Sequence, residues 1–408
     1  MTTTHKPRYL DRSTPPHIST LILVTGLSAL TLTVFLPSLP KMTAYFETDY
    51  RLMQLSVAVY LSVNAVLQIF IGPVSDKMGR RPVILWGTAL FILATLGCLM
   101  AQNVYLFLFF RMMQAVVVVG MVLGRAVVRD MHSQEDSASM IGYVTMGTAV
   151  VPMIGPAIGG FLDATLGWHA VFVMLLAAGA LLFILVWFDL GETGKASGLS
   201  LSQQIGEYPE LLTSPRFWGY SAASALSSGA FFAYLGGAPF VGTEVFGMES
   251  AEMGMFFGAP AIGYFVGNFL SGRFSQRVGI NSMITYGTVT CAFGLFISLL
   301  LSLGGLESKW TFFGLMTFVG LGNGLVIPNA TAGALSVRPH LAGTASGLSG
   351  ALMLAGGAGL SAWAGTLLSP GAGAWPLLVL MLGTCVMGIV AIGLVVIRER
   401  RLEQLAQN

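Results

Sequence analysis

Charged side chains are scarce in this 408-residue sequence: Asp, Glu, Lys and Arg make up 9% of it, against about 25% in soluble domains. With 55% hydrophobic residues and a mean hydropathy of +0.77, the chain has too few polar residues to cover a water-exposed surface. We therefore expect an all-α integral membrane protein. The 20 basic and 18 acidic residues nearly balance. The resulting net charge of +2 gives no electrostatic support for binding a nucleic acid.

Cysteine and catalytic motifs are also lacking. The three cysteines, Cys98, Cys291 and Cys385, lie in apolar runs without the spacing of a metal site or a disulfide framework. The segment 191–196 (GETGKA) only superficially resembles a Walker A loop, because Asp189 and Ala196 replace its first glycine and its Ser/Thr. Neither HExxH nor GxSxG occurs. These absences disfavour an ATP-driven pump and an enzyme, and we expect no cofactor and no metal.

Long apolar runs dominate the chain instead. A helix needs about 20 apolar residues to cross a bilayer, whereas barrel strands need about ten that alternate with polar ones. Twelve runs fit the helical pattern, and the first, which lacks a small-residue cleavage site, is predicted to be an uncleaved helix. The predicted spans are 18–40, 53–72, 82–101, 104–127, 138–161, 168–189, 217–240, 252–271, 281–303, 310–330, 343–367 and 375–397.

The basic residues predict the orientation of these spans. With the N-terminus in the cytoplasm, every Lys and Arg except Lys41, Arg51, Arg111 and Lys309 falls on the cytoplasmic side. The positive-inside rule therefore favours a multi-pass protein with both termini in the cytoplasm.

The chain carries an internal repeat. The longest internal polar segment divides the spans into six and six, which predicts an N-terminal bundle 1–190, a cytoplasmic linker 191–216 and a C-terminal bundle 217–408. GPVSDKMG at 72–79 is echoed by GRFSQRVG at 272–279, each between the second and third spans of its half. Two repeated halves predict a substrate site at the midplane between them and alternating access.

The segment 72–82 (GPVSDKMGRRP) resembles the loop 2–3 signature of the major facilitator superfamily. Further segments resemble the Bcr/CflA-like drug:proton antiporters, namely 36–40 (LPSLP), 111–115 (RMMQA), 155–160 (GPAIGG), 328–332 (PNATA) and 342–346 (AGTAS). The resemblance implies the major facilitator fold, two six-helix bundles related by pseudo-two-fold symmetry. It further implies a monomer in the bacterial inner membrane that exports small drug-like molecules in exchange for protons, a basis of antibiotic resistance. Many relatives carry an Asp three residues before the Leu-Pro pair, where this chain has Thr33.

Arg111 lies well inside the fourth span. An arginine there costs about 2.5–3.5 kcal/mol on insertion scales, so we expect it to face a cavity or a partner rather than lipid. At 100° per residue, Gln114, Arg125 and Arg129 share an arc of about 60° with it, while Gly120 and Gly124 lie on the other side, where a helix can pack. Arg111 then serves coupling or substrate binding, or bonds backbone carbonyls of the first span, or does both.

The acidic residues suggest which substrates suit this site. All 18 lie in loops or near helix ends, so Arg111 has no evident carboxylate partner and the pocket favours neutral, zwitterionic or anionic compounds over cations. Asp76 and Asp130 are the candidates for carrying the proton. The predicted substrate and coupling residues are Arg111, Gln114, Thr31, Thr33, Tyr60, Asn64, Phe232, Tyr234, Tyr264, Asn268 and Asn323. Each of the polar and aromatic residues is also compatible with plain interhelical packing.

Two motifs predict regions that change their contacts during transport. The loop 2–3 motif is expected to form a charged latch, or else only to fix topology, through Gly72, Asp76, Gly79, Arg80, Arg81, Arg125, Arg129 and Asp130. The second copy has Gln276 in place of Asp76, so the charged latch is expected on one side only. The fifth span is expected to form a kinked, leak-proof interface, or ordinary small-residue packing, through Pro152, Gly155, Pro156, Gly159 and Gly160.

Other functions remain open at this point. The predicted spans and the repeat are equally compatible with a metabolite exporter of the same fold, which would carry a nucleoside, sugar or amino acid. A non-transporting membrane sensor is a more remote alternative, because sensors usually append a soluble domain.

Overall fold

The computed structural model describes residues 9–12, 14, 16–131, 151, 154–194, 209–338 and 342–407, and these ranges are almost entirely helical. In the first half of the chain the elements are α1 (Ile18–Thr33), η1 (Leu36–Ser38), α2 (Leu39–Tyr45), α3 (Tyr50–Met78), α4 (Arg80–Met100), α5 (Val104–Gln114), η2 (Ala115–Val117), α6 (Val118–Met131) and α8 (Trp168–Asp189). The second half holds α10 (Pro215–Phe240), η3 (Val241–Val245), α11 (Ser250–Phe256), α12 (Ala259–Val278), α13 (Ile280–Leu303), α14 (Lys309–Ser336), α15 (Ala342–Leu367) and α16 (Trp375–Gln407).

Within the described ranges, ten helices are long and apolar enough to cross a membrane, which makes this a multi-pass membrane protein. The other two predicted spans differ from the ten. Helix α10 has 26 residues, but its serines and glycines lower its mean hydropathy. The predicted span 138–161 lies mostly outside the described residues, and its end appears as the short apolar helix Ile154–Leu166.

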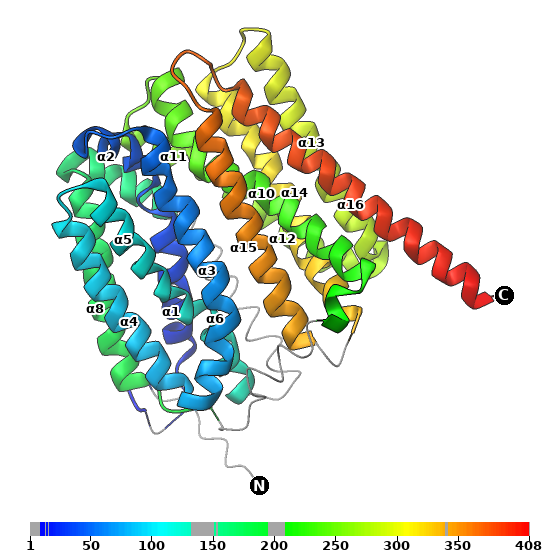
Figure 1. The fold of residues 1–408 in the computed structure, drawn as a ribbon, viewed down its shortest axis with the longest axis horizontal. Coiled ribbons are helices and arrows are strands. Elements are labelled where there is room, and N and C mark those ends of the chain that lie inside the picture. Colours follow the sequence, from blue (N-terminus) through cyan, green and yellow to red (C-terminus); the bar gives the residue numbers. More distant parts are fainter. Residues whose placement is uncertain are drawn as a thin grey trace.

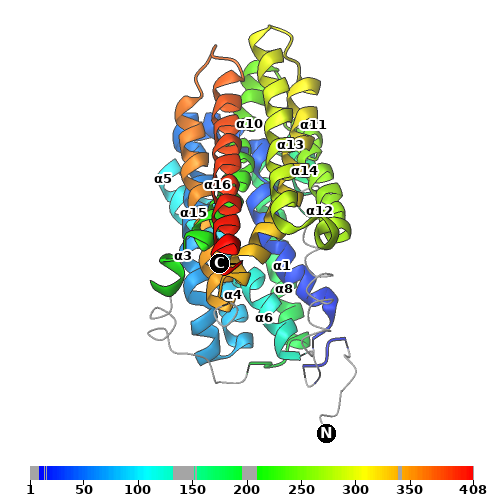
Figure 2. The ribbon, with the colours of Figure 1, turned by 90° about the vertical axis from the view of Figure 1, so that its right-hand side faces the viewer.

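The helices form two bundles (Figure 1). Helices α1 to α8 make one bundle and α10 to α16 the other, and α15 lies beside α3 where the bundles meet. Seen from the side, α16 runs along the outer face of the second bundle (Figure 2). We call the end of the molecule that holds Gly79, Asp189 and Pro215 the linker end, and the opposite end the distal end. The domain limits at 190, 191–216 and 217 stay a prediction.

The two copies of the repeat adopt the same backbone turn. Gly79 (φ 95°, ψ 153°) separates α3 from α4, and Gly279 (φ 89°, ψ 148°) separates α12 from α13. The N–H of Gly79 donates to the carbonyl of Ser75 at 2.8 Å, and that of Gly279 to the carbonyl of Ser275 at 2.9 Å. A positive φ is costly for residues with a Cβ, which explains the glycine at each turn.

Alanine substitutions within these motifs should separate backbone strain from packing. Gly79→Ala and Gly279→Ala are each expected to lower stability by about 1–3 kcal/mol, because residues with a Cβ rarely adopt this positive-φ conformation. Gly79→Ala should cost more, since its Cβ would lie 2.9 Å from the Glu192 carboxyl carbon, while Gly279 has open space. Gly72 and Gly272 also have open space and lie inside helices, so their alanine variants are the matched controls. Melting temperatures in detergent measure the order, and equal effects at all four positions would refute this explanation.

The fourth predicted span is not one continuous α-helix. The 3-10 segment η2 interrupts it between α5 and α6, so the regular 100° step does not run from Arg111 to Arg125. Arg111 is buried and Arg125 is exposed, and the expected single face containing both stays a prediction. The expected glycine packing is confirmed: a Cβ at Gly124 would lie 2.6 Å from the Thr25 methyl group, and Gly120 abuts Val24 of α1.

The bundles meet along α3 and α15 and at the distal end. Gln54 Nε2 donates to Ser361 Oγ at 2.8 Å and also to the Ser361 carbonyl. The hydroxyl of Tyr50 donates to the carbonyl of Gly236 at 2.8 Å. These contacts join the start of α3 to α15 and α10, and so fix the distal ends of the two bundles against each other.

Candidate functional site

Arg111 forms the centre of a buried polar cluster in the first bundle. Only 1% of its surface is exposed. Its guanidinium donates to Gln114 Oε1 and to the Thr31 carbonyl, both at 2.8 Å, and stacks over the rings of Phe35 and Tyr60 at 4.1 and 4.3 Å from their centroids. The bond to Thr31 means that Arg111 does bind a backbone carbonyl of α1. Ring faces attract the cation in a desolvated site.

Three polar atoms of this cluster lack a hydrogen-bond partner among the described residues. They are Arg111 Nε, the Tyr60 hydroxyl and Asn64 Oδ1. Tyr60 and Asn64 are four residues apart on α3 and therefore lie on one helix face. Buried polar groups normally find partners, and an unpaired one costs about 1–3 kcal/mol. The cluster thus keeps donors and acceptors that a bound molecule can satisfy.

No described carboxylate neutralises Arg111. Among the described residues, the buried acids are Asp163 and Asp189, and both have other partners. Asp163 pairs with Lys41 at 3.0 Å, and Asp189 accepts from the Thr20 hydroxyl at 2.6 Å. Thr33 does not compensate for the missing acid, since its hydroxyl donates to the Ala29 carbonyl in its own helix.

Gln114 links the cluster to α4. Its Nε2 donates to Thr95 Oγ1 at 2.8 Å, and Thr95 in turn donates to the Phe91 carbonyl at 2.7 Å. Phe35 and Thr95 were not among the residues predicted from the sequence. The only sequence signal for Phe35 is its position directly before the Leu36-Pro37 pair.

The predicted residues of the second bundle lie apart from Arg111, with no described hydrogen bond joining the two groups. Asn323 accepts from the Ser227 hydroxyl at 2.6 Å, and Asn268 donates to the Tyr264 carbonyl at 2.8 Å. Tyr234 is buried among aromatic rings, 5.1 Å from Phe257 between centroids, and its hydroxyl has no described partner. The last of these residues, Phe232, packs beside Gly357 of α15.

The latch residues gather at the linker end of the first bundle. Arg80 Nε pairs with Asp130 Oδ2 at 3.0 Å, and Arg80 also donates to Ser75 Oγ, whose hydroxyl donates to the Gly72 carbonyl. Arg81 instead bonds the end of α8, donating to the carbonyls of Leu190 and Trp187 at 2.8 and 3.1 Å. The side chains of Asp76 and Arg129 lie outside the described part of the structure.

Glu192 belongs to this latch although the sequence analysis did not place it there. Its carboxylate accepts from the backbone N–H of Arg80 at 2.8 Å and of Arg81 at 3.3 Å, at the first turn of α4. A carboxylate is favoured at a helix N-terminus by the exposed N–H groups and the helix dipole. An acid directly after the sixth span was the available signal, but its partners lie more than 100 residues away in sequence.

The helix Ile154–Leu166 contacts both bundles through its small residues. A Cβ at Gly155 would lie 3.0 Å from the Thr33 hydroxyl, and Gly159 abuts the carbonyl of Val34. On the other side, Gly160 abuts Ser250 of α11, and Gly254 of α11 abuts Pro156. Pro152 lies outside the described residues. These contacts bring the two bundles together backbone to backbone at the distal end.

Two six-helix bundles with a repeated turn, a buried polar cluster and a tight distal contact define a secondary membrane transporter. The profile of the Major Facilitator Superfamily matches residues 21–362. The chain belongs to this superfamily.

Similar proteins place the chain among drug-efflux members of the superfamily. It is 30% identical to a chloramphenicol resistance protein of Pseudomonas aeruginosa, covering 89% of this chain and 87% of that one. It is 28% identical to the bicyclomycin resistance protein homologue of Haemophilus influenzae, over 85% and 88% of the two chains. In fold it resembles a bacterial homologue of the human lysosomal transporter Spinster, with a TM-score of 0.73, 19% identity and coverage of 94% and 96%.

Proposed function

We propose that this protein exports small drug-like molecules from the bacterial cytoplasm in exchange for protons, by alternating access. The relatives named for chloramphenicol and bicyclomycin resistance support the substrate class. We further propose an inner-membrane location with both termini in the cytoplasm, a monomeric state, and no enzymatic activity. In this orientation the linker end faces the cytoplasm, and the distal contact closes the carrier towards the outside.

The observation that carries the proposal for the site is the buried Arg111 without a described carboxylate partner. A neutral or anionic molecule between the bundles gains donors from Arg111 and Tyr60 and an acceptor from Asn64. A cationic molecule meets a positive charge with nothing to offset it, and like charges in contact cost several kcal/mol. The proposed substrates are therefore neutral, zwitterionic or anionic.

The test uses everted membrane vesicles with a respiration-driven pH gradient and a pH-sensitive dye. A neutral phenicol is expected to dissipate the gradient at concentrations at least about tenfold lower than the cation ethidium, because Arg111 repels the cation. Vesicles that lack the protein control for leak. Potent, saturable exchange of ethidium would refute the charge preference while leaving export intact.

The same assay decides between export of drugs and export of a metabolite. Silence across phenicols, other neutral antibiotics and cationic dyes would reject proton-coupled drug export. Gradient dissipation by nucleosides, sugars or amino acids would then assign the protein to metabolite export.

A further inference from the structure

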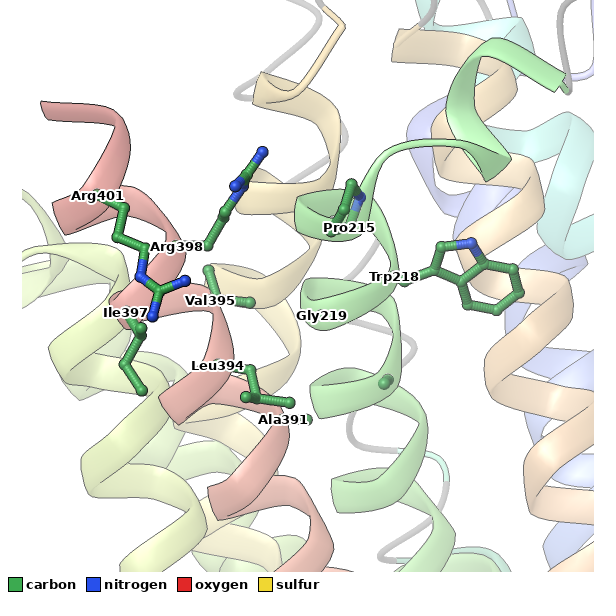
Figure 3. Close-up of a pocket in the computed structure, with 10 residues that line it drawn as sticks. Pro215, Trp218, Gly219, Ala391, Leu394, Val395, Ile397, Arg398 and Arg401 are labelled. Atoms are coloured by element: carbon green, nitrogen blue, oxygen red, sulfur yellow. The ribbon is translucent and has the colours of Figure 1, made fainter. Parts of the chain in front are cut away.

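A groove of about 790 Å³ lies between α10 and α16 at the linker end of the second bundle (Figure 3). Its lining comes from these two helices and divides into an apolar stretch and a basic end. The lining residues are Pro215, Trp218, Gly219, Ala222, Ala391, Leu394, Val395, Ile397, Arg398 and Arg401. The groove therefore belongs to the second bundle, whereas Arg111 lies on α5 of the first.

The apolar stretch of the groove faces the membrane. Leu394 and Ile397 are 62% and 52% exposed, and α16 is apolar enough to span the bilayer from Trp375 to Arg401. From Ala391 to Arg401 the helix rises about 15 Å, which is half of the roughly 30 Å hydrocarbon core. The groove thus has the length of one leaflet, or of one acyl chain.

The basic end of the groove carries positive charge that no described carboxylate offsets. Arg398 and Arg401 are three residues apart on α16, both exposed, and neither makes an ion pair with any described carboxylate. The nearby Glu399 does not offset them, because it is already engaged by Arg216 at 2.6 Å and by Asn281 at 2.5 Å. Two positive charges therefore remain at the level where the span ends.

Trp218 marks the same level on α10. Its ring is 42% exposed, and its indole N–H donates to the Leu212 carbonyl at 2.7 Å. Tryptophan is enriched where hydrocarbon meets the headgroups. The aromatic ring on α10 and the arginines on α16 thus both place this end of the groove at the headgroup layer.

We propose that this groove is a binding site for an anionic phospholipid. Its phosphate lies against Arg398 and Arg401, and an acyl chain lies along Ala222, Ala391 and Leu394. Charge selects an anionic headgroup, since the two guanidinium groups are the only unpaired charges among the described lining residues. The apolar length beneath them selects a lipid over a free phosphate.

The test measures lipid binding to the full-length protein purified in detergent, by native mass spectrometry. Phosphatidylglycerol is titrated against phosphatidylcholine with the same acyl chains, and glycerol 3-phosphate serves as the headgroup without chains. The double variant Arg398→Gln/Arg401→Gln is expected to weaken phosphatidylglycerol binding about 25-fold, since each arginine near anionic lipid contributes roughly fivefold. Arg400→Gln, an exposed arginine of the same turn outside the groove, is the matched control and should change binding less than about twofold.

A second pair of variants tests the apolar stretch without changing charge. Ala222→Phe fills the groove and is expected to weaken phosphatidylglycerol binding, whereas Val390→Phe adds the same ring to an exposed position of α16 outside the lining. Equal losses in Arg400→Gln and the double variant would reject a defined site in favour of diffuse surface charge. Equal binding of both lipids, or of glycerol 3-phosphate with no effect of Ala222→Phe, would reject an anionic lipid as the occupant. The readout is independent of transport.

Discussion

Replacing Arg111 by alanine is expected to reduce substrate-driven proton exchange roughly 100-fold while the protein still reaches the membrane. The substitution removes the buried cation and leaves Gln114 Oε1 and the Thr31 carbonyl without their donor. Hydrogen bonds to a charged group contribute about 1.5–3 kcal/mol each. The everted-vesicle assay measures the loss, and the melting temperature of the purified variant measures folding.

Arg111→Lys separates charge from geometry at this position. Lysine keeps the positive charge but lacks the planar guanidinium group that donates to Gln114 and to Thr31 at the same time. We expect it to retain part of the activity, about a tenth of the unmodified protein, and to keep the preference for neutral substrates. Arg51→Ala is the control, since Arg51 is an exposed arginine of α3 that belongs neither to the predicted site nor to the latch. Normal transport by a well-folded Arg111→Ala variant would reduce Arg111 to a structural residue.

Adding a methyl group to Gly160 or Gly254 is expected to open the distal contact between the bundles. A Cβ at Gly160 would lie 3.0 Å from the Ser250 carbonyl carbon, and one at Gly254 would lie 3.0 Å from that of Pro156. Backbone cannot move aside as a side chain can, and overpacking costs about 1–3 kcal/mol. This destabilisation applies only to the state in which the distal ends of the bundles are in contact. The ratio of molecules closed at the distal end to molecules open there should therefore drop roughly 5- to 150-fold.

Spin labels across the distal end report this change. Asp49→Cys and Glu249→Cys place one label before α3 and one before α11, at exposed positions whose side chains cap neither helix. Gly160→Ala and Gly254→Ala should lengthen the distance between the labels and slow transport. Gly314→Ala of α14, where a Cβ meets nothing within 4 Å, is the control. An unchanged distance distribution in the first two variants would show that the contact tolerates a methyl group.

Much of the architecture was predictable because it follows from local patterns. Apolar runs of helical length predict the spans, and the spacing of Gly72, Ser75 and Gly79 predicts the repeat, since both depend on neighbouring residues only. The packing of Gly120 and Gly124 against α1 followed from helical periodicity. The 3-10 segment η2 was not predicted, because no local signal in Ala115–Val117 announces it.

The contacts of the candidate site were less accessible to sequence reasoning. That Arg111 stacks on Phe35, or that Gln54 donates to Ser361, depends on how helices from distant parts of the chain cross. The positions of the acids near the helix ends did indicate that Arg111 has no acidic partner, and none occurs among the described residues. The roles of the predicted site residues in transport remain predictions that the variants above test.

The junction after each glycine turn has a wider consequence. Arg81 ties the start of α4 to the end of α8, and at the corresponding place Asn281 ties the start of α13 to Glu399 near the end of α16. In the first half an arginine donates to backbone carbonyls, and in the second half an asparagine amide donates to a carboxylate. Both contacts connect the start of one helix to the end of another at equivalent positions. The two halves thus form a contact at the same position from different groups, and only the contact in the second half depends on an ionisable carboxylate and hence on pH.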